Sequence, residues 1–398
     1  MKRKLSEICR FYSGTGFPTV YQGKINDELP FYKVGDIASN VNLGNIYLKN
    51  CNNYISRKEA EEIKGTIVPK DTIVFAKIGE ALKLNRRAIT SCDCLIDNNV
   101  MGIEPIADII TTGYFFYFMK QLKLQKYAEK TTVPSVRKST LEQLDITVPT
   151  LEEQKEIELL LNKAAKLILL RKQELDQLDN LIKARFVEMF GEPIANPKRW
   201  PVKCLKELSS LITNGTTPKG GSENYVKHGI MFLRSQNVWR NRIELDDVAF
   251  IDESTHNNMK KSSLHHKDIL ITKTGRINTE NSSLGRAALF LGADNSANIN
   301  GHVYLVRLNG TVVPEFVTTI LTGEAYRKYI RKVCVGGIDK RQINVEQVEE
   351  FPIILPPFDL QKQFSHFVTQ IDKSKVVVQK SLEQTQLLFD SLMQQYFG

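Results

Sequence analysis

The feature that most constrains this chain is a long internal repeat. The stretch that begins at Val148 matches the stretch that begins at Leu355 at a constant offset of 207 residues, and the match runs without a gap to Gly191 and Gly398. Loops between elements tolerate insertions and deletions. An ungapped match of this length therefore indicates two copies of one rigid element.

Each copy has the pattern of a long helix. After Pro149 in the first copy and Pro357 in the second, neither contains Pro or Gly before its final residue, and about 40 residues at helical rise span roughly 60 Å. Apolar residues recur at steps of three and four, which is a heptad seam. In the first copy these are Ile157, Leu161, Ala164, Ile168, Leu175, Leu178, Ile182 and Met189, and in the second Phe364, Val368, Ile371, Val378, Leu382, Phe389 and Met393. The seam favours a coiled coil between the copies; a pair of ordinary core helices is the alternative.

The stretches before the two helices correspond more loosely. A Gly-Thr turn at 14–18 has a counterpart at 215–218, and predicted strands at 30–37 and 71–79 have counterparts at 230–238 and 268–275. We predict an α+β fold of two similar α/β domains, each followed by a long helix. We expect the two helices to pair as an antiparallel coiled coil with pseudo-two-fold symmetry.

These patterns predict five segments. A linker with three prolines separates the first helix from the second domain, because proline ends a helix. The segments are a first domain at 1–147, a first long helix at 148–190, the linker at 191–201, a second domain at 202–354 and a second long helix at 355–398.

The charge lies mainly outside the predicted helices. The chain has 54 Lys and Arg against 45 Asp and Glu, whereas residues 151–190 and 358–398 are close to neutral. A basic surface favours polyanionic partners. No run approaches the roughly 18 apolar residues of a membrane helix, and no apolar secretory segment follows the basic N-terminus. We expect a cytoplasmic protein without membrane partners.

The usual motifs of catalysis and metal binding are missing. The six cysteines and six histidines are dispersed, and the close pair Cys92 and Cys94 lacks zinc-knuckle spacing. There is no Walker loop, nucleophile elbow or glycine-rich S-adenosylmethionine loop, and no nuclease site is complete around Asp71 and Lys77. We expect no catalytic residue, no metal and no cofactor in this chain.

The duplicated domain and helix resemble the specificity (S) subunit of Type I restriction–modification enzymes over essentially the whole chain. The most specific feature is the pattern Pro-x-Leu/Phe-x-x-Gln-Lys at 149–155 and 356–362, supported by the turn at 215–218 and the strand at 268–271. The first domain departs from the usual turn with its Gly-Thr-Gly-Phe-Pro at 14–18.

The resemblance implies a non-catalytic DNA-recognition subunit. Each globular domain would be a target recognition domain that reads one half of a split site in double-stranded DNA. The helices would space these domains and dock two methyltransferase (M) subunits, with restriction/translocase (R) subunits also in the complex. S-adenosylmethionine, ATP and Mg would then belong to the partner subunits.

Candidate contacts follow from this resemblance and from the chemistry of DNA recognition. Basic side chains bind phosphate, and Arg, Lys, Asn and Gln on loops can read bases. The candidates for DNA binding are Lys33, Lys77, Arg86, Arg87, Asn98, Lys219, Arg234, Gln236, Asn237, Lys273, Arg276, Arg286 and Arg341. The candidates for subunit docking are Gln154, Ile157, Leu161, Leu178, Gln361, Phe364, Ile371 and Leu382.

Two other classes of protein remain open on sequence grounds. One is a stand-alone sequence-specific DNA-binding regulator, which would bind tightly without partners. The other is a coiled-coil scaffold with no role on nucleic acid, which the charge outside the helices disfavours.

Overall fold

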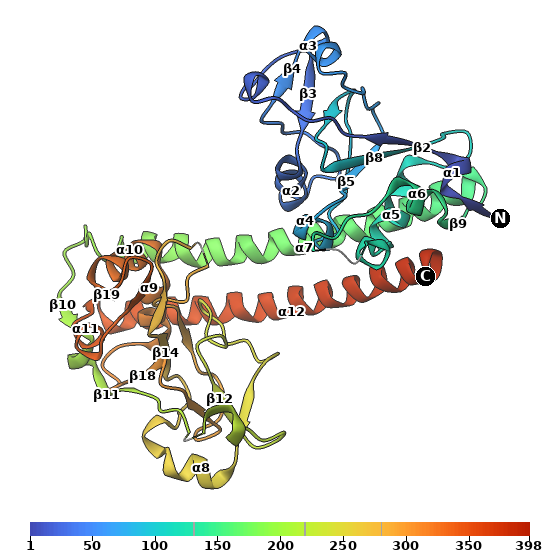
Figure 1. The fold of residues 1–398 in the computed structure, drawn as a ribbon. Helices are drawn as coiled ribbons and strands as arrows, with labels where there is room; N and C mark the ends of the chain where they lie inside the picture. The colour runs from blue at the N-terminus through green and yellow to red at the C-terminus, as the bar shows by residue number, and fades with distance from the viewer. Residues whose placement is uncertain (130–131, 219, 280) are drawn as a thin grey trace. The chain divides into compact units, whose positions relative to one another are not determined.

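The structure is a computed structural model that describes residues 1–129, 132–218, 220–279 and 281–398. The chain forms two compact units (Figure 1). Unit 1 comprises Met1–Gln173 together with Gln379–Gly398, and unit 2 comprises Glu174–Val378. Each of the two long helices, α7 (Leu151–Phe190) and α12 (Phe358–Phe397), therefore contributes one part to each unit.

Three small sheets form the framework of unit 1. Its buried strands are rich in β-branched and aromatic residues, as in the Ile-Val-Phe-Ala run of β5, which suits a strand covered on both faces. The antiparallel four-stranded sheet has the order β2 (Cys9–Ser13), β8 (Val100–Pro105), β5 (Ile73–Ala76) and β6 (Ala88–Ile89). A mixed sheet has the order β4 (Tyr54–Ile55), β3 (Leu29–Tyr32) and β7 (Leu95–Ile96), and β1 (Lys2–Lys4) pairs with β9 (Asp145–Thr147).

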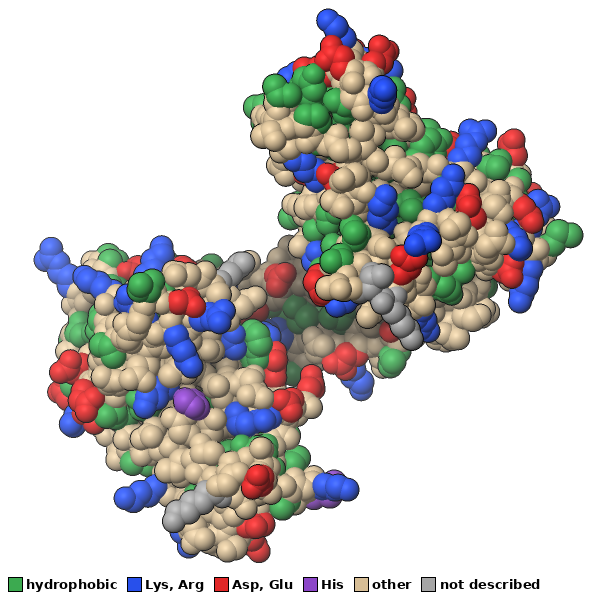
Figure 2. Space-filling model, in the orientation of Figure 1, with side chains coloured by type: hydrophobic (Ala, Val, Ile, Leu, Met, Phe, Trp, Pro, Cys, Tyr) green, Lys and Arg blue, Asp and Glu red, His purple; other side chains and the backbone are tan. Residues whose placement is uncertain are grey.

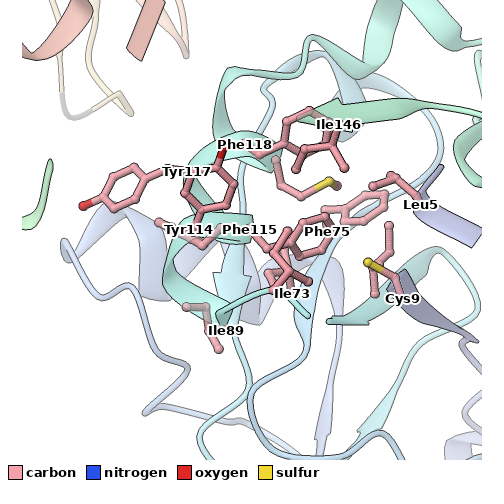
Figure 3. Packing of buried hydrophobic residues seen from close by; sticks show 14 of the residues in the cluster. Leu5, Cys9, Ile73, Phe75, Ile89, Tyr114, Phe115, Tyr117, Phe118 and Ile146 are labelled. Carbon is pink, nitrogen blue, oxygen red and sulfur yellow. The ribbon is translucent and has the colours of Figure 1, made fainter. Parts of the chain in front are cut away.

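The main core of unit 1 lies between its four-stranded sheet and helix α5 (Thr112–Gln121). Figure 3 shows Tyr114, Phe115 and Phe118 of α5 beside Ile73 and Phe75 of β5. The shorter helices are α1 (Leu5–Ile8), α2 (Val34–Asn42), α3 (Arg57–Glu62), α4 (Glu80–Lys83) and α6 (Lys138–Glu142), with 3-10 turns η1 (Thr19–Tyr21) and η2 (Leu124–Tyr127).

Unit 2 repeats the strand order of unit 1. Its four-stranded sheet runs β11 (Ser209–Asn214), β18 (Val303–Leu308), β14 (Ile269–Thr272) and β16 (Ala287–Leu289). Its mixed sheet runs β13 (Ala249–Ile251), β12 (Ile230–Leu233) and β17 (Ala297–Ile299), and β10 (Val202–Cys204) pairs with β21 (Pro352–Ile354). A further sheet has the order β15 (Thr274–Arg276), β20 (Lys340–Gln342) and β19 (Val335–Gly336).

The helices of unit 2 cover a core that contains buried Phe316 and Tyr326. They are α8 (Glu253–Asn258), α9 (Pro314–Thr322), α10 (Glu324–Val333) and α11 (Val345–Glu349), with 3-10 turns η3 (Leu205–Leu208), η4 (Gly221–Asn224) and η5 (Lys260–Ser262). Helices α9 and α10 are separated at Gly323, whose extended backbone ends α9 and begins α10.

The long helices pack against each other inside each unit. In unit 1, Leu161 from the first part of α7 shares a core with Phe389 and Met393 from the last part of α12. In unit 2, Phe186 and Phe190 of α7 pack on Phe364 of α12, with ring centroids 5.4 and 5.6 Å apart. The helices thus run antiparallel, and the predicted fold class is confirmed.

One glutamine near the start of each long helix fastens it to its domain. Gln154 Oε1 accepts from the Thr111 N–H (2.7 Å), and its Nε2 donates to the Ile109 and Pro149 carbonyls. Gln361 Oε1 accepts from the Val313 N–H (3.0 Å), and its Nε2 donates to the Pro356 carbonyl. Both side chains are buried. The Gln of the repeated helix-start pattern therefore stabilises the attachment of each long helix to its domain.

The first strand of each mixed sheet is shorter than the sequence suggested. The predicted strand at 30–37 ends at Tyr32, because Asp36 accepts a hydrogen bond from the Lys33 N–H (2.8 Å) and starts helix α2. The predicted strand at 230–238 ends at Leu233, where Asn237 accepts from the Arg234 N–H (2.9 Å) and closes a turn. Both changes come from a side chain that competes with the sheet for the backbone.

Candidate nucleic-acid interface

In the loop after β12 of unit 2, three predicted contact residues bind the same acidic residue, Asp247. Gln236 Nε2 donates to Asp247 Oδ2 (2.8 Å), and the Arg234 guanidinium is 3.1 Å from the same oxygen. The hydrogen bond from Gln236, followed by that from Arg234, lowers the pKa of Asp247. Asn237 Nδ2 donates to the Glu244 and Asp247 carbonyls. Because Asn237 is only 2% exposed, it shapes this loop rather than presenting a free amide.

A hollow of about 340 Å³, lined by Trp239 and by polar and charged residues, opens next to this loop. It brings together the predicted residues Gln236, Arg276 and Arg286, which lie far apart in the sequence. The remaining lining residues are Ser235, Trp239, Thr279, Asn281, Ser282 and Ser283. Sequence reasoning missed these residues, since Ser and Asn in loops are common and only the fold shows that they converge.

The further sheet of unit 2 positions several basic residues beside the hollow. Arg276 on β15 pairs in register with Lys340 on β20, and Gly275 pairs with Arg341. Asp339 lies 3.3 Å from the Arg276 guanidinium. Lys273 precedes β15, and its Nζ lies 5.8 Å from the ring centroid of Tyr304. Lys340 is a basic residue that the sequence reasoning did not select.

Arg286 forms one wall of the hollow. Its Nε donates to the Ser282 carbonyl (3.0 Å), its Nη2 donates to the Asn281 carbonyl, and its guanidinium lies 3.8 Å from the ring centroid of Trp239. Burial lowers the pKa of this arginine, and the nearby charge of Arg240 lowers it further. The guanidinium is therefore held rigidly against an aromatic face.

The predicted contacts of unit 1 lie at several separate places. Lys33 precedes α2, with Nζ 5.2 Å from the Phe17 ring centroid and 2.8 Å from Gln22 Oε1. Lys77 follows β5, Arg86 precedes β6, and both are half-buried, whereas Asn98 after β7 is exposed.

Arg87 differs from the other candidates because its side chain is buried. Its guanidinium lies 4.8 Å from the ring centroid of Phe75 and donates to the Arg86 carbonyl and to Asn85 Oδ1. Its Nε has no hydrogen-bond partner, and burial lowers its pKa. Arg87 therefore packs inside unit 1. The candidate Lys219 lies outside the described residues.

The six apolar residues predicted for docking lie on the buried and half-buried side of the long helices, whereas Gln154 and Gln361 bind their own domains. Ile157, Leu161 and Phe364 are buried, and Leu178, Ile371 and Leu382 are half-buried. The heptad pattern did not identify the outer apolar residues, which are more than a third exposed. These include Leu159, Leu160, Leu167, Leu170, Leu181, Val376, Val377, Leu387 and Leu388.

Charge alone does not delimit an interface. Figure 2 shows Lys and Arg side chains interspersed with Asp and Glu on the visible face of both units. Among the described residues, no group of three or more His, Cys, Asp and Glu side chains could hold a metal ion. None of the helices in the described ranges is long and apolar enough to cross a membrane.

Comparison with known proteins identifies the family. The model of the Type I restriction modification DNA specificity domain matches residues 1–180 and again residues 197–385. The chain belongs to this family. The two matches together span most of the sequence, and the resemblance seen in the sequence is confirmed.

Curated relatives from Methanocaldococcus jannaschii include two specificity subunits. The MjaIX specificity subunit is 22% identical over 419 residues, covering 98% of this chain and 91% of the relative. The MjaVIII specificity subunit is 23% identical over 305 residues, covering 73% of this chain and 70% of the relative.

Two solved structures share the fold over the full chain. The S subunit of a Type I restriction–modification system from M. genitalium has a TM-score of 0.58 at 14% identity, and covers 100% of this chain and 96% of its own. A structure describing complex assembly and conformational transition of the type I R-M system has a TM-score of 0.55 at 16% identity, with 100% and 97% coverage.

Proposed function

We propose that this chain is the DNA sequence-specificity subunit of a Type I restriction–modification complex, with each unit binding one half of a bipartite target. The observation that carries the proposal is the duplication: the family matches both halves of the chain, and both units have the same strand order. Two recognition modules on one chain suit a target made of two separated half-sequences.

In unit 2 the hollow supplies the chemistry for reading bases. Arg276 can donate two hydrogen bonds to guanine, and Gln236 can bind adenine with both ends of its amide, because these edges are distinct in the major groove. Lys273 and Arg341 lie on or beside the same small sheet and would bind phosphate, which fixes the register of the protein on DNA. Arg234 and Asn237 would hold the reading loop in place.

In unit 1 the exposed and half-buried candidates would make the corresponding contacts. Asn98 is suited to a base edge, and Lys33, Lys77 and Arg86 are suited to phosphates. Lys219 in unit 2 has the same chemistry as these lysines. Arg87 would act from within the fold by holding the turn that carries Arg86, because its Nη1 donates to the Arg86 carbonyl (2.8 Å).

The long helices would fix the spacing of the two units and dock two methyltransferase subunits. The seam residues bury one face of each helix, and the outward-facing leucines leave an apolar surface that a partner can cover. Catalysis, S-adenosylmethionine, ATP and Mg would lie in the methyltransferase and restriction subunits. The complex would work in the cytoplasm, where its DNA is found.

Replacement of one unit tests this division of labour. A chimera in which residues 202–354 come from a related chain should change one half of the methylated target and leave the other half unchanged. Methylation-site sequencing of genomic DNA from cells with the parent or the chimeric complex gives both half-sequences. A matched chimera of residues 1–147 should change the opposite half, and a change in both halves by either chimera would contradict the proposal.

The same preparations separate two other functions. A stand-alone DNA-binding regulator would bind the identified target equally well after its partner subunits are removed. A scaffold protein would bind no duplex DNA in either state. The hollow of unit 2, whose lining includes Arg276 and Arg286, favours DNA binding over a pure scaffold role.

A further inference from the structure

A hairpin of unit 2 ends in a bare isoleucine. Strands β19 and β20 pair antiparallel, and beyond them the Gly337 N–H donates to the Lys340 carbonyl (3.2 Å), so Ile338 and Asp339 form a two-residue tip. Ile338 is 90% exposed, and no other large apolar side chain in the described part of the chain is exposed as much. All of residues 335–340 are exposed. We call residues 335–342 the β19–β20 hairpin.

The tip of this hairpin is braced by the neighbouring strand. The Ile277 N–H, directly after β15, donates to the Asp339 carbonyl (3.0 Å), and Asp339 Oδ2 lies 3.3 Å from Arg276 Nε. Single exposed apolar side chains are common on protein surfaces. Ile338 differs from them because hydrogen bonds and an ion pair fix the backbone that presents it.

One glycine lets the two strands of the hairpin approach closely. Gly336 has a φ of 129°, a conformation that favours glycine, and a Cβ there would lie 2.9 Å from the Lys340 carbonyl oxygen. A Cβ on Gly337 would have its nearest neighbour at 3.9 Å, which is an ordinary contact. The position of the tip therefore depends on the first glycine and tolerates a methyl group at the second.

Positive charge surrounds the apolar tip. Residues 331–342 include four basic side chains and one acidic side chain, Asp339, which already lies beside Arg276. The basic residues are Arg331, Lys332, Lys340 and Arg341. This combination suits a polyanion that offers apolar groups between its charges. A segment that binds a membrane surface instead presents a whole apolar face.

We propose that Ile338 reads thymine through its C5-methyl group when the β19–β20 hairpin enters the major groove at the half-site bound by unit 2. This inference rests on the proposed function and adds a specificity-determining residue to it. The major groove admits a two-stranded β-ribbon, and the methyl group distinguishes thymine from the other bases there. Because Arg276 lines the hollow and also contacts Asp339, the tip and the hollow would address neighbouring base pairs.

The test compares duplexes that differ by single methyl groups. Uracil in place of thymine keeps the base pair and the O4 acceptor and removes only the C5-methyl group. The target comes from the methylation-site sequencing described above, and the chimeras identify the half bound by unit 2. Each thymine of that half, on either strand, is replaced in turn. Fluorescence anisotropy then gives the affinity of the full-length chain, purified with any co-purifying subunits.

We expect one replacement to weaken binding by the parent about four-fold, the effect of one buried methyl group. Ile338→Ala should bind the unmodified duplex more weakly and should no longer distinguish thymine from uracil at that position. Its salt slope, the slope of log affinity against log salt concentration, should equal that of the parent because no phosphate contact is lost. Since Ile338 is exposed, the variant should fold normally.

Three further variants serve as controls. Leu291→Ala removes a 66% exposed apolar side chain that follows β16, whereas Arg286 of the hollow precedes this strand, and it should keep the preference for thymine. Gly336→Ala should abolish the preference, because the new methyl group displaces the tip. Gly337→Ala should keep it.

Several results would overturn the inference while leaving DNA recognition intact. These are a half-site without thymine on either strand, a parent that no replacement weakens, and a preference for thymine that persists in Ile338→Ala. Loss of co-purifying subunits from Ile338→Ala would show that the tip binds a protein and would also overturn it. So would sedimentation of the parent, but not of Ile338→Ala, with phosphatidylserine vesicles. If the parent binds no duplex at low salt, the proposed function fails, and this inference fails with it.

Discussion

The two units share one scaffold and differ where that scaffold meets solvent. Both units have the same strand order in the four-stranded and mixed sheets. In both, a buried glutamine near the start of a long helix binds the domain. Their charges are also similar: residues 1–147 have 21 basic and 16 acidic side chains, and residues 202–354 have 20 and 16. The amount of charge therefore cannot account for the hollow of unit 2, which exists because of where the fold places Gln236, Arg276 and Arg286.

The difference arises after the first strand of each mixed sheet. In unit 1 the chain enters helix α2 at Val34, whereas in unit 2 it forms the loop that contains Gln236 and Trp239. Unit 2 also has the three-stranded sheet with Arg276 and Arg341, where unit 1 has an isolated bridge between Ile78 and Ser135. The comparison teaches that a conserved strand order can support two differently equipped surfaces.

The largest expected effects test what the units share. Gln154→Leu leaves the Thr111 N–H without its acceptor and two carbonyls without their donor. Because these groups are buried, we expect a loss of about 3 kcal/mol in the unfolding free energy of unit 1. Gln361→Leu removes one acceptor and one donor and should cost about 2 kcal/mol in unit 2. Urea unfolding followed by circular dichroism measures both.

Fluorescence distinguishes the two units in the same experiment. Trp200 and Trp239 both lie in unit 2, so their emission should report the loss in Gln361→Leu and remain near the parent curve in Gln154→Leu. Gln363→Leu on the exposed side of α12 is the matched control and should leave both signals unchanged. If both signals shift together in Gln154→Leu, the units unfold as one body and the comparison between them breaks down.

Much of the shared scaffold could be predicted from the sequence, and most of the site could not. The long helices follow from local periodicity, and the seam residues Leu161 and Phe364 are buried as a heptad pattern requires. The hollow depends on tertiary contacts: Arg276 and Ser282 meet Gln236 only because β15 and the loop after β12 converge. A hydrophilic loop residue carries no periodic signal, so the burial of Asn237 and Arg87 was equally hidden.

The next pair of variants exchanges Asp and Asn at equivalent positions of the two units, and the expected losses of unfolding free energy are smaller. Asp36 and Asn237 occupy the same place, since each accepts from the N–H of the residue three positions before it. Asn237→Asp replaces a donor to the Glu244 and Asp247 carbonyls with a buried carboxylate, and we expect a loss of about 2–3 kcal/mol in unit 2.

The opposite exchange should be milder. Asp36→Asn keeps one acceptor oxygen but places an amide where the carboxylate accepts from the Asn52 N–H and side chain, so we expect about 1–2 kcal/mol in unit 1. Thermal unfolding by circular dichroism, with tryptophan emission for unit 2, measures the pair. Equal losses would show that the two positions are interchangeable and that their different residues carry no structural information.

The smallest expected effect concerns the arginine that precedes β6 or β16 in each unit. Arg286 faces Trp239 in the hollow, whereas Arg87 is buried against Phe75 with its Nε unbonded. Burial lowers the pKa of Arg87, because the charged guanidinium loses its hydration inside the fold. Since an arginine stays protonated in proteins, the cost of burying this charge is present at pH 7.

Arg87→Met should therefore change the unfolding free energy at pH 7 by no more than about 1 kcal/mol, because the lost hydrogen bonds and ring contact are offset by removal of a buried charge. Its salt slope for duplex binding should equal that of the parent, whereas Arg286→Met should lower it. Urea unfolding at pH 7 and a fluorescence-anisotropy titration of duplex DNA at several salt concentrations measure both. A reduced salt slope in Arg87→Met would show that Arg87 and Arg286 both contribute to phosphate binding, despite their different surroundings.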